Sequence, residues 1–264
     1  MVRQRVLPAL VLGVALWWLA GLEVWVYLAV LPLFAMGGAA EFYHLLHRAG
    51  HRPAWLLGLV GAVLLAVSPA LGAQAAFHVL AVGSFLALCW ATWRYPRGEG
   101  LLDWFSTLAP PLYVGGLLGY FLLLRQLPAG DYWVRTVFLC TWAADITAFL
   151  VGRRWGHTKL APLLSPHKTW EGAVGGLLAA GSAGAALGLV WPVAGWPAWQ
   201  LGSLGLLIGG AALVGDLCES FLKRQLGAKD SSRLLLGHGG LLDRLDSLLA
   251  AGMVAYYYVA GVGR

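Results

Sequence analysis

The chain has 264 residues, of which 59% are hydrophobic and only 11% are charged; soluble domains carry about 25% charged residues. This composition excludes an intrinsically disordered chain and a disulfide-rich secreted scaffold, because polar surface is scarce and there are only three cysteines. The formal net charge of +6 is explained by basic cytoplasmic loops, so we expect no nucleic-acid partner. The composition therefore predicts an integral membrane protein with several spans.

Nine apolar segments are each long enough to cross a bilayer, which takes about 20 helical residues. They cover residues 6–22, 24–45, 53–71, 74–93, 101–124, 132–152, 172–191, 198–221 and 242–262. We therefore expect an all-α polytopic membrane protein. It divides into an N-terminal five-span membrane region over residues 1–130 and a C-terminal four-span catalytic region over residues 131–264, with cytoplasmic loops at 153–171 and 222–241.

The basic residues predict how these spans are oriented. With the N-terminus in the cytoplasm, all of the 18 basic residues except Arg125, Arg135 and Arg264 lie on the cytoplasmic side or at the helix ends facing it. Cytoplasmic loops of membrane proteins carry such an excess of Lys and Arg. Because the number of spans is odd, the C-terminus is expected on the opposite side.

Acidic residues within apolar spans are the first indication of function, since a carboxylate at membrane depth is costly and is retained for a purpose. Asp145 lies in the middle of the span 132–152, and Asp216 and Glu219 lie near the end of 198–221. Glu41, in the second span, is interpreted as a packing or interfacial residue, with access to the same polar cavity as the alternative.

Residues 216–246 concentrate the remaining chemistry. Asp216, Glu219, Ser220 and Lys223 recur at intervals of three and four residues and share one face of a helix. Carboxylate oxygens and substrate phosphates are the ligands that Mg²⁺ prefers, and neighbouring Lys and Arg side chains bind the remaining phosphate charge. The segment therefore predicts a magnesium and phosphate site.

The order of residues in this segment resembles the signature of the phosphatidate cytidylyltransferases, or CDP-diacylglycerol synthases. The matching residues are Ser220, Lys223-Arg224, Lys229-Asp230, Gly237-His238-Gly239-Gly240 and Asp243-Arg244-Leu245-Asp246. Leu236 stands where the family usually has proline. Upstream, a second stretch resembles the family at Asp145, Gly152-Arg153 and Ser165-Pro166-His167-Lys168-Thr169-Trp170-Glu171-Gly172.

The resemblance implies an enzyme that condenses CTP with phosphatidate to give CDP-diacylglycerol and pyrophosphate, with Mg²⁺ and a possible second cation as cofactors. It implies metal binding by Asp216, Asp243, Asp246 and Glu219. The catalytic residues that it implies are Asp216, Lys223, Arg224, Lys229, Asp230, His238, Asp243, Arg244 and Asp246. The substrate-binding residues that it implies are Asp145, Arg153, Lys168, Glu171, Ser220, Lys223, Arg224, Lys229, Gly239, Gly240 and Arg244.

Such an enzyme is expected in the bacterial inner membrane, with its active site facing the cytoplasm and membrane lipids as partners; a homodimer is a further expectation. Three alternatives remain open at this stage. The chain could be a cytidylyltransferase or a CTP-dependent kinase that acts on another lipid. It could be a cation transporter, with Asp145, Asp216 and Asp243 lining the path. It could also be a structural membrane scaffold.

Overall fold

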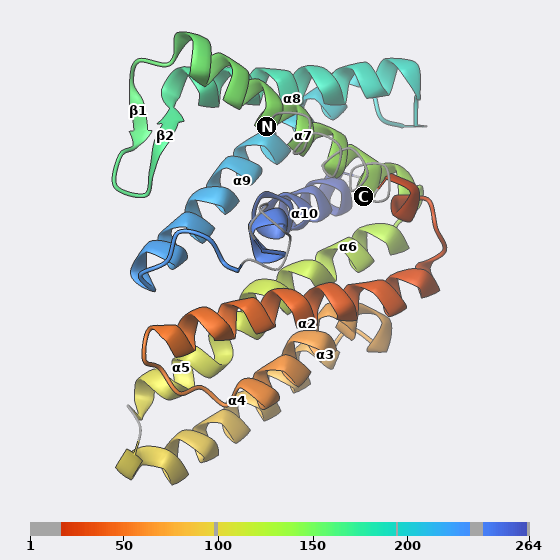
Figure 1. Cartoon of the computed structure of the whole chain (residues 1–264). Helices are drawn as coiled ribbons and strands as arrows, with labels where there is room; N and C mark the ends of the chain where they lie inside the picture. The colour runs from red at the N-terminus through yellow and green to blue at the C-terminus, as the bar shows by residue number, and fades with distance from the viewer. Residues whose placement is uncertain (1–16, 98–99, 194, 233–239, 263–264) are drawn as a thin grey trace. The chain divides into compact units, whose positions relative to one another are not determined.

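The computed structural model describes residues 17–97, 100–193, 195–232 and 240–262 (Figure 1). Almost all of the described chain is helical. In chain order the elements are α2 (Val24–Arg48), α3 (Trp55–Leu71), α4 (Ala75–Arg94), the 3-10 turn η1 (Tyr95–Arg97), α5 (Leu101–Pro110), the π-helical segment η2 (Pro111–Gly116), α6 (Leu117–Gln126), α7 (Gly130–Trp155), β1 (Lys159–Ala161), β2 (Ser165–Thr169), α8 (Trp170–Val190), α9 (Ala198–Gln225) and α10 (Leu242–Val262).

Seven helical segments in the described part of the chain are long and apolar enough to cross a membrane, with α5, η2 and α6 together forming one of them. The helix α3 is apolar but shorter. The predicted class, an all-α integral membrane protein, is thereby confirmed. Of the predicted spans, the first, 6–22, lies mostly outside the described residues, and each of the others corresponds to a helical segment.

The chain forms two compact units, each built from separate stretches of sequence. The first unit comprises residues Met1–Glu23, Leu124–Phe221 and Asp246–Arg264, and the second comprises Val24–Leu123 and Leu222–Leu245. The helices α9 and α10 each contribute residues to both units, because α9 passes from the first unit to the second after Phe221 and α10 returns to the first at Asp246.

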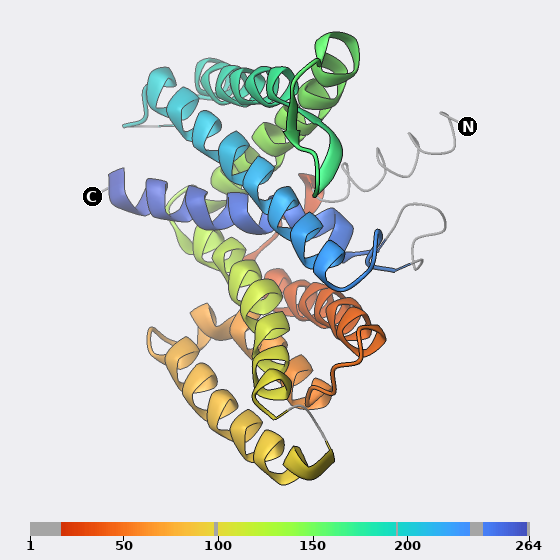
Figure 2. The same ribbon diagram turned by 90° about the vertical axis from the view of Figure 1, so that its left-hand side faces the viewer.

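In the first unit, α8 lies along α7 (Figures 1 and 2). Glycines on α8 allow the two backbones to approach closely, as is common between membrane helices. A Cβ atom added at Gly176 would lie 2.8 Å from the Ala144 carbonyl oxygen and 3.1 Å from the Ala148 Cβ. The interface therefore depends on the absence of a side chain at this position.

In the second unit, buried polar groups join α2, α3 and α5. Tyr43 Oη on α2 donates a hydrogen bond of 2.6 Å to the Thr107 carbonyl oxygen on α5. The backbone N–H of Ala54, just before α3, donates to Thr107 Oγ1 at 2.9 Å. Asp103 is only 1% exposed and accepts a hydrogen bond of 3.1 Å from the backbone N–H of Arg52. These contacts satisfy polar atoms that would otherwise be costly in an apolar bundle.

The structure adds one element that the sequence did not predict. Residues 153–171 were expected to form a cytoplasmic loop, but they include the last residues of α7 and an antiparallel hairpin of β1 and β2. Lys159 pairs with Thr169, and Ala161 pairs with Ser165. Three-residue and five-residue strands are too short for an alternating hydrophobic pattern to stand out in the sequence.

We expect Gly176→Ala to destabilise the first unit, because the added methyl group would collide with the α7 backbone. Overpacking of this kind costs about 1–3 kcal/mol. The measurement is thermal unfolding in detergent, followed by intrinsic tryptophan fluorescence. Gly210→Ala on α9 is the matched control, since a Cβ atom there has no neighbour within 4 Å. An unfolding midpoint for Gly176→Ala equal to that of the control would contradict this packing.

Candidate functional site

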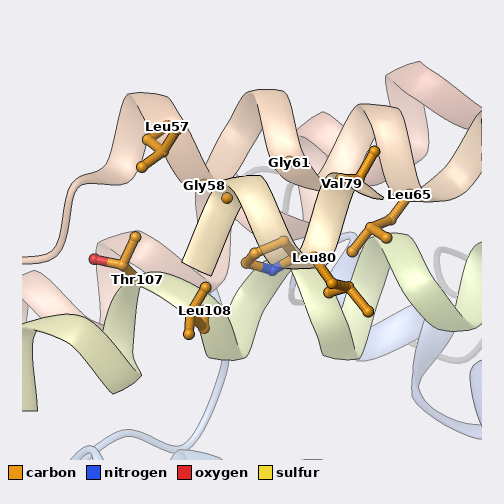
Figure 3. Close-up of a pocket in the computed structure, with 10 residues that line it drawn as sticks. Leu57, Gly58, Gly61, Leu65, Val79, Leu80, Thr107 and Leu108 are labelled. Carbon is orange, nitrogen blue, oxygen red and sulfur yellow. The ribbon is translucent and has the colours of Figure 1, made fainter. Parts of the chain in front are cut away.

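An apolar hollow in the second unit lacks the side chains that a catalytic site for phosphates would need. It lies within the second unit among α3, α4 and the chain from Thr107 to Pro111, as Figure 3 shows. Its lining consists of Leu57, Gly58, Gly61, Leu65, Val79, Leu80, Gly83, Thr107, Leu108 and Pro111, none of which is titratable. Charged or metal-ligating side chains mark a site that binds phosphates and a metal ion. The candidate site is therefore sought among the charged residues.

The predicted site residues gather in two clusters, one in each unit. The first-unit cluster consists of Asp145 on α7, Lys168 on β2, and Asp216 and Ser220 on α9. The second-unit cluster is built around Lys223 and Asp243, with three further residues that contact Asp243 or its neighbours: Glu41, Ser231 and Ser232.

In the first-unit cluster, Lys168 and Asp216 form an ion pair. Lys168 Nζ lies 2.6 Å from Asp216 Oδ2, with the side chains 19% and 33% exposed. Ser220 Oγ lies one turn further along α9 and donates to Asp216 Oδ1 at 3.4 Å. The Asp145 carboxylate lies near enough to be repelled by Asp216 and attracted by Lys168. Lys168 is therefore the cation that acts on both carboxylates of this cluster.

The hairpin and the start of α8 determine where Lys168 lies. The backbone N–H of Thr158 donates to Glu171 Oε1 at 3.0 Å, and Trp170 N–H donates to the Thr158 carbonyl oxygen at 2.9 Å. Thr169 is buried and caps α8, since its Oγ1 accepts a hydrogen bond from Gly172 N–H at 3.2 Å. These contacts fix the residues that follow Lys168 and explain why a Thr-x-Glu sequence stands there.

In the second-unit cluster, Asp243 is surrounded by donors. Lys223 Nζ donates to Asp243 Oδ1 at 2.6 Å, and both side chains are only 13% exposed. Asp243 Oδ2 accepts hydrogen bonds from Gly240 N–H at 2.7 Å and from Ser231 N–H at 3.1 Å. Ser231 Oγ also lies 2.9 Å from Asp243 Oδ2. The carboxylate is thus held in one orientation at the beginning of α10.

Glu41 belongs to this cluster, although the sequence favoured a packing or interfacial role. Its side chain is 7% exposed, and its two carboxylate oxygens accept hydrogen bonds from four groups of the 222–245 segment. These are Ser231 Oγ, Ser232 Oγ, Leu241 N–H and Leu242 N–H. The signal in the sequence was a carboxylate inside an apolar span, but nothing in the sequence indicated its partners.

Among the described residues, the other predicted site residues differ in their exposure and in their contacts. Glu219 is completely buried on α9, and Asp246 Oδ1 accepts a hydrogen bond of 2.6 Å from Ser247 N–H. Arg224 is exposed and donates to the Ala228 carbonyl oxygen at 3.3 Å. The side chains of Arg153, Lys229, Asp230 and Arg244 are exposed. His238 and Gly239 lie outside the described residues.

The donor atoms available for a magnesium ion are of the right kind. Carboxylate and hydroxyl oxygens suit a hard divalent ion, and the first-unit cluster offers those of Asp145, Asp216 and Ser220. Among the described residues, however, no group of three or more His, Cys, Asp and Glu side chains comes together as a metal site. The oxygen chemistry therefore fits the ion, while a complete set of protein ligands is not assembled within the described part of the chain.

Comparison with known proteins agrees with this chemistry. The sequence model of the Cytidylyltransferase family matches residues 3–262. The chain is 37% identical over 264 residues to a phosphatidate cytidylyltransferase of Brucella abortus, an alignment that covers 98% of this chain and 93% of the relative. It is 32% identical over 289 residues to the phosphatidate cytidylyltransferase of Synechocystis sp., covering 97% and 96% of the two chains. A relative of the same name from Pseudomonas aeruginosa is 44% identical over 144 residues, about half of each chain. The chain belongs to the Cytidylyltransferase family.

Proposed function

We propose that this chain condenses CTP with phosphatidate in the membrane, giving CDP-diacylglycerol and pyrophosphate. The observation that carries this proposal is similarity over nearly the full length of the chain to relatives named phosphatidate cytidylyltransferase. An integral membrane enzyme is also suited to phosphatidate, whose acyl chains remain in the lipid while its phosphate enters a polar site.

The reaction requires positioning and charge neutralisation more than acid–base chemistry. A phosphate oxygen of phosphatidate attacks the α-phosphorus of CTP, a new P–O bond forms, and the bond to the departing pyrophosphate breaks. The nucleophile is already anionic, so no strong general base is needed. Catalysis of this kind depends on holding the two phosphates in line and on offsetting their charge.

Lys168 and Lys223 are the residues best placed to offset that charge. Each is mostly buried and lies 2.6 Å from an aspartate oxygen, so each ammonium group is held in a fixed position. We assign them to the phosphates of CTP and phosphatidate, together with the exposed cations Arg153, Arg224, Lys229 and Arg244. The same two ion pairs argue against a cation transporter, because a lysine beside each aspartate opposes the entry of a cation.

We also propose a magnesium requirement, with oxygen ligands from Asp216, Glu219, Asp243 and Asp246. When bound, Mg²⁺ would reduce the negative charge of the triphosphate and favour departure of pyrophosphate. Lys168 would hold Asp216 in place, and Lys223 would hold Asp243 in place. The support for this proposal is the family resemblance, which implies these four ligands, and the hard oxygen chemistry of their carboxylates.

The proposed orientation has nine spans, the N-terminus in the cytoplasm, the C-terminus on the opposite side, and the site facing the cytoplasm of a bacterial inner membrane. It is supported by the basic residues of the hairpin region, including Arg153, Arg154 and Lys159, which would all be cytoplasmic.

The proposed activity predicts that purified protein in detergent converts labelled CTP and phosphatidate into CDP-diacylglycerol in a Mg²⁺-dependent reaction. Asp243→Asn should reduce kcat at least 100-fold, because Lys223 and Gly240 would lose their anionic partner. Asp131→Asn is the control, since Asp131 pairs with Arg135 at the other end of α7. A wild-type protein that forms no CDP-lipid, or that accepts only an ether-lipid phosphate, would refute the proposal.

Lys168→Met should lower kcat/KM at least tenfold, equivalent to about 1.4 kcal/mol, because Asp145 and Asp216 would lose their shared cation. Lys168→Arg should retain part of the activity, since it preserves the charge. Lys159→Met, which removes an exposed lysine from β1 of the same hairpin, should change kcat/KM less than twofold. The steady-state rates of all three variants provide the measurement, and wild-type kcat/KM in Lys168→Met would show that this cation is not used.

Leu163, at the tip of the hairpin, is 92% exposed and tests the orientation. In a variant without native cysteines, Leu163→Cys should react with a membrane-impermeant maleimide in inside-out inner-membrane vesicles but not in intact spheroplasts. Labelling in spheroplasts would place the hairpin on the opposite side and would overturn the proposed topology.

A further inference from the structure

Glu41 is a buried carboxylate on a largely apolar helix. It lies in α2, where the neighbouring residues are mostly Ala, Gly and aromatic side chains, and only 7% of it is exposed. A carboxylate in such surroundings is costly unless hydrogen bonds replace the water that it has lost. Its partners therefore indicate what it does.

Within the described part of the chain, the partners of Glu41 lie in the segment that joins α9 to α10 and at the first residue of α10. Oε2 accepts from Ser231 Oγ at 2.8 Å and from Leu242 N–H at 2.9 Å. Oε1 accepts from Ser232 Oγ at 2.7 Å and from Leu241 N–H at 2.9 Å. Glu41 thus binds Ser231 and Ser232, which precede residues 233–239, and also Leu241 and Leu242, which follow them.

Small residues on α2 allow this approach. Gly37 lies one turn before Glu41, and a Cβ atom added there would lie 2.7 Å from Leu241 Cδ2. A Cβ atom at Gly38 would lie 3.7 Å from Leu245 Cδ1. The first turn of α10 therefore packs against glycines of α2, in register with the carboxylate that binds its backbone.

The hydrogen bonds also define the electrostatic role of Glu41. Leu241 and Leu242 stand at the N-terminus of α10, where backbone N–H groups have no intrahelical partner and a negative charge is favourable. Two hydrogen bonds to each oxygen use the accepting capacity of the carboxylate. Glu41 therefore acts as a cap supplied by another helix.

The capped turn is the one that carries Asp243. Ser231 connects the two carboxylates directly, since its Oγ lies 2.8 Å from Glu41 Oε2 and 2.9 Å from Asp243 Oδ2. A hydroxyl group has one proton and donates it to one of these oxygens at a time. Ser231 N–H and Gly240 N–H complete the contacts to Asp243 from both flanks of the same segment.

We propose that Glu41 is a positioning residue: by joining Ser231 and Ser232 to the start of α10, it holds Asp243 opposite Lys223. This role rests on the proposed function, in which Asp243 and Lys223 serve the reaction. Glu41 contacts neither substrate; it acts through the backbone of Leu241 and Leu242 and through the two serines.

The first test compares Glu41→Gln with the control Glu23→Gln, which changes an exposed carboxylate outside the cluster. Glutamine retains the shape but has one accepting oxygen and an amide group that donates, so it opposes two of the four donors. We expect kcat to fall at least tenfold while KM for CTP changes less than threefold, with the protein folded by gel filtration and thermal unfolding. Wild-type kcat in Glu41→Gln would overturn the proposal.

A second variant keeps the proposal testable if Glu41→Gln folds poorly. Ser232→Ala in the wild-type background removes one donor to Glu41 Oε1 and should lower kcat about threefold, and an unchanged kcat in this variant would overturn the proposal. In the Glu41→Gln background the same change should have no further effect, because contacting residues are energetically coupled. Fully additive losses of kcat in the double variant would show that Ser232 and Glu41 do not act together, and would overturn the proposal.

A third measurement needs no activity and separates the two proposals. Hydrogen–deuterium exchange of the peptide containing Leu241 and Leu242 should be faster in Glu41→Gln and unchanged in Glu23→Gln. If wild type forms no CDP-lipid but this exchange difference appears, the proposed function fails and the capping role of Glu41 stands. If wild type is active and Glu41→Gln shows neither faster exchange nor reduced kcat, the positioning role fails while the proposed function stands.

Discussion

The need to satisfy carboxylates in an apolar chain governs the polar structure of this protein. Removing a carboxylate from water is costly, and the cost is offset only by a cation or by several donors. Asp216 has Lys168, Asp243 has Lys223, and Glu41 has four hydrogen-bond donors. The hairpin, the α8 cap and the turn before α10 are the local structures that bring these partners into place.

The two clusters pair their aspartates with lysines that come from different kinds of structural element. In the first unit, a short hairpin tied to the start of α8 presents a lysine to the carboxylate of a neighbouring helix. In the second unit, the cation comes from α9 itself, and the other donors to Asp243 are the backbone N–H groups of Ser231 and Gly240 and the Ser231 hydroxyl group. The helix α9 carries residues of both clusters, Asp216 and Ser220 of the first-unit cluster and Lys223 of the second-unit cluster.

This distribution of charge suits a reaction between two phosphates. Phosphatidate and CTP are both anionic, so a site for them must contain fixed cations, and those cations must be stable before the substrates arrive. A lysine paired with an aspartate meets both conditions, since the pair is neutral in the resting protein and the ammonium group is already oriented. The cost of burying each lysine is offset by its aspartate partner.

The sequence by itself determined the membrane class, the helical segments from residue 24 onward and the family resemblance. Apolar runs of about 20 residues have few alternatives to a membrane helix, and the residues that resemble the family stand in a fixed order along the chain. Only the tertiary structure decided the partners: that Lys168 faces Asp216, that Lys223 faces Asp243, and that Glu41 binds residues some two hundred positions away. It also decided that residues 159–169 form a hairpin, whose strands are too short to show an alternating hydrophobic pattern in the sequence. Spans follow from local composition, whereas ion pairs and caps depend on which helices pack together, and that packing is fixed by contacts distant in the sequence.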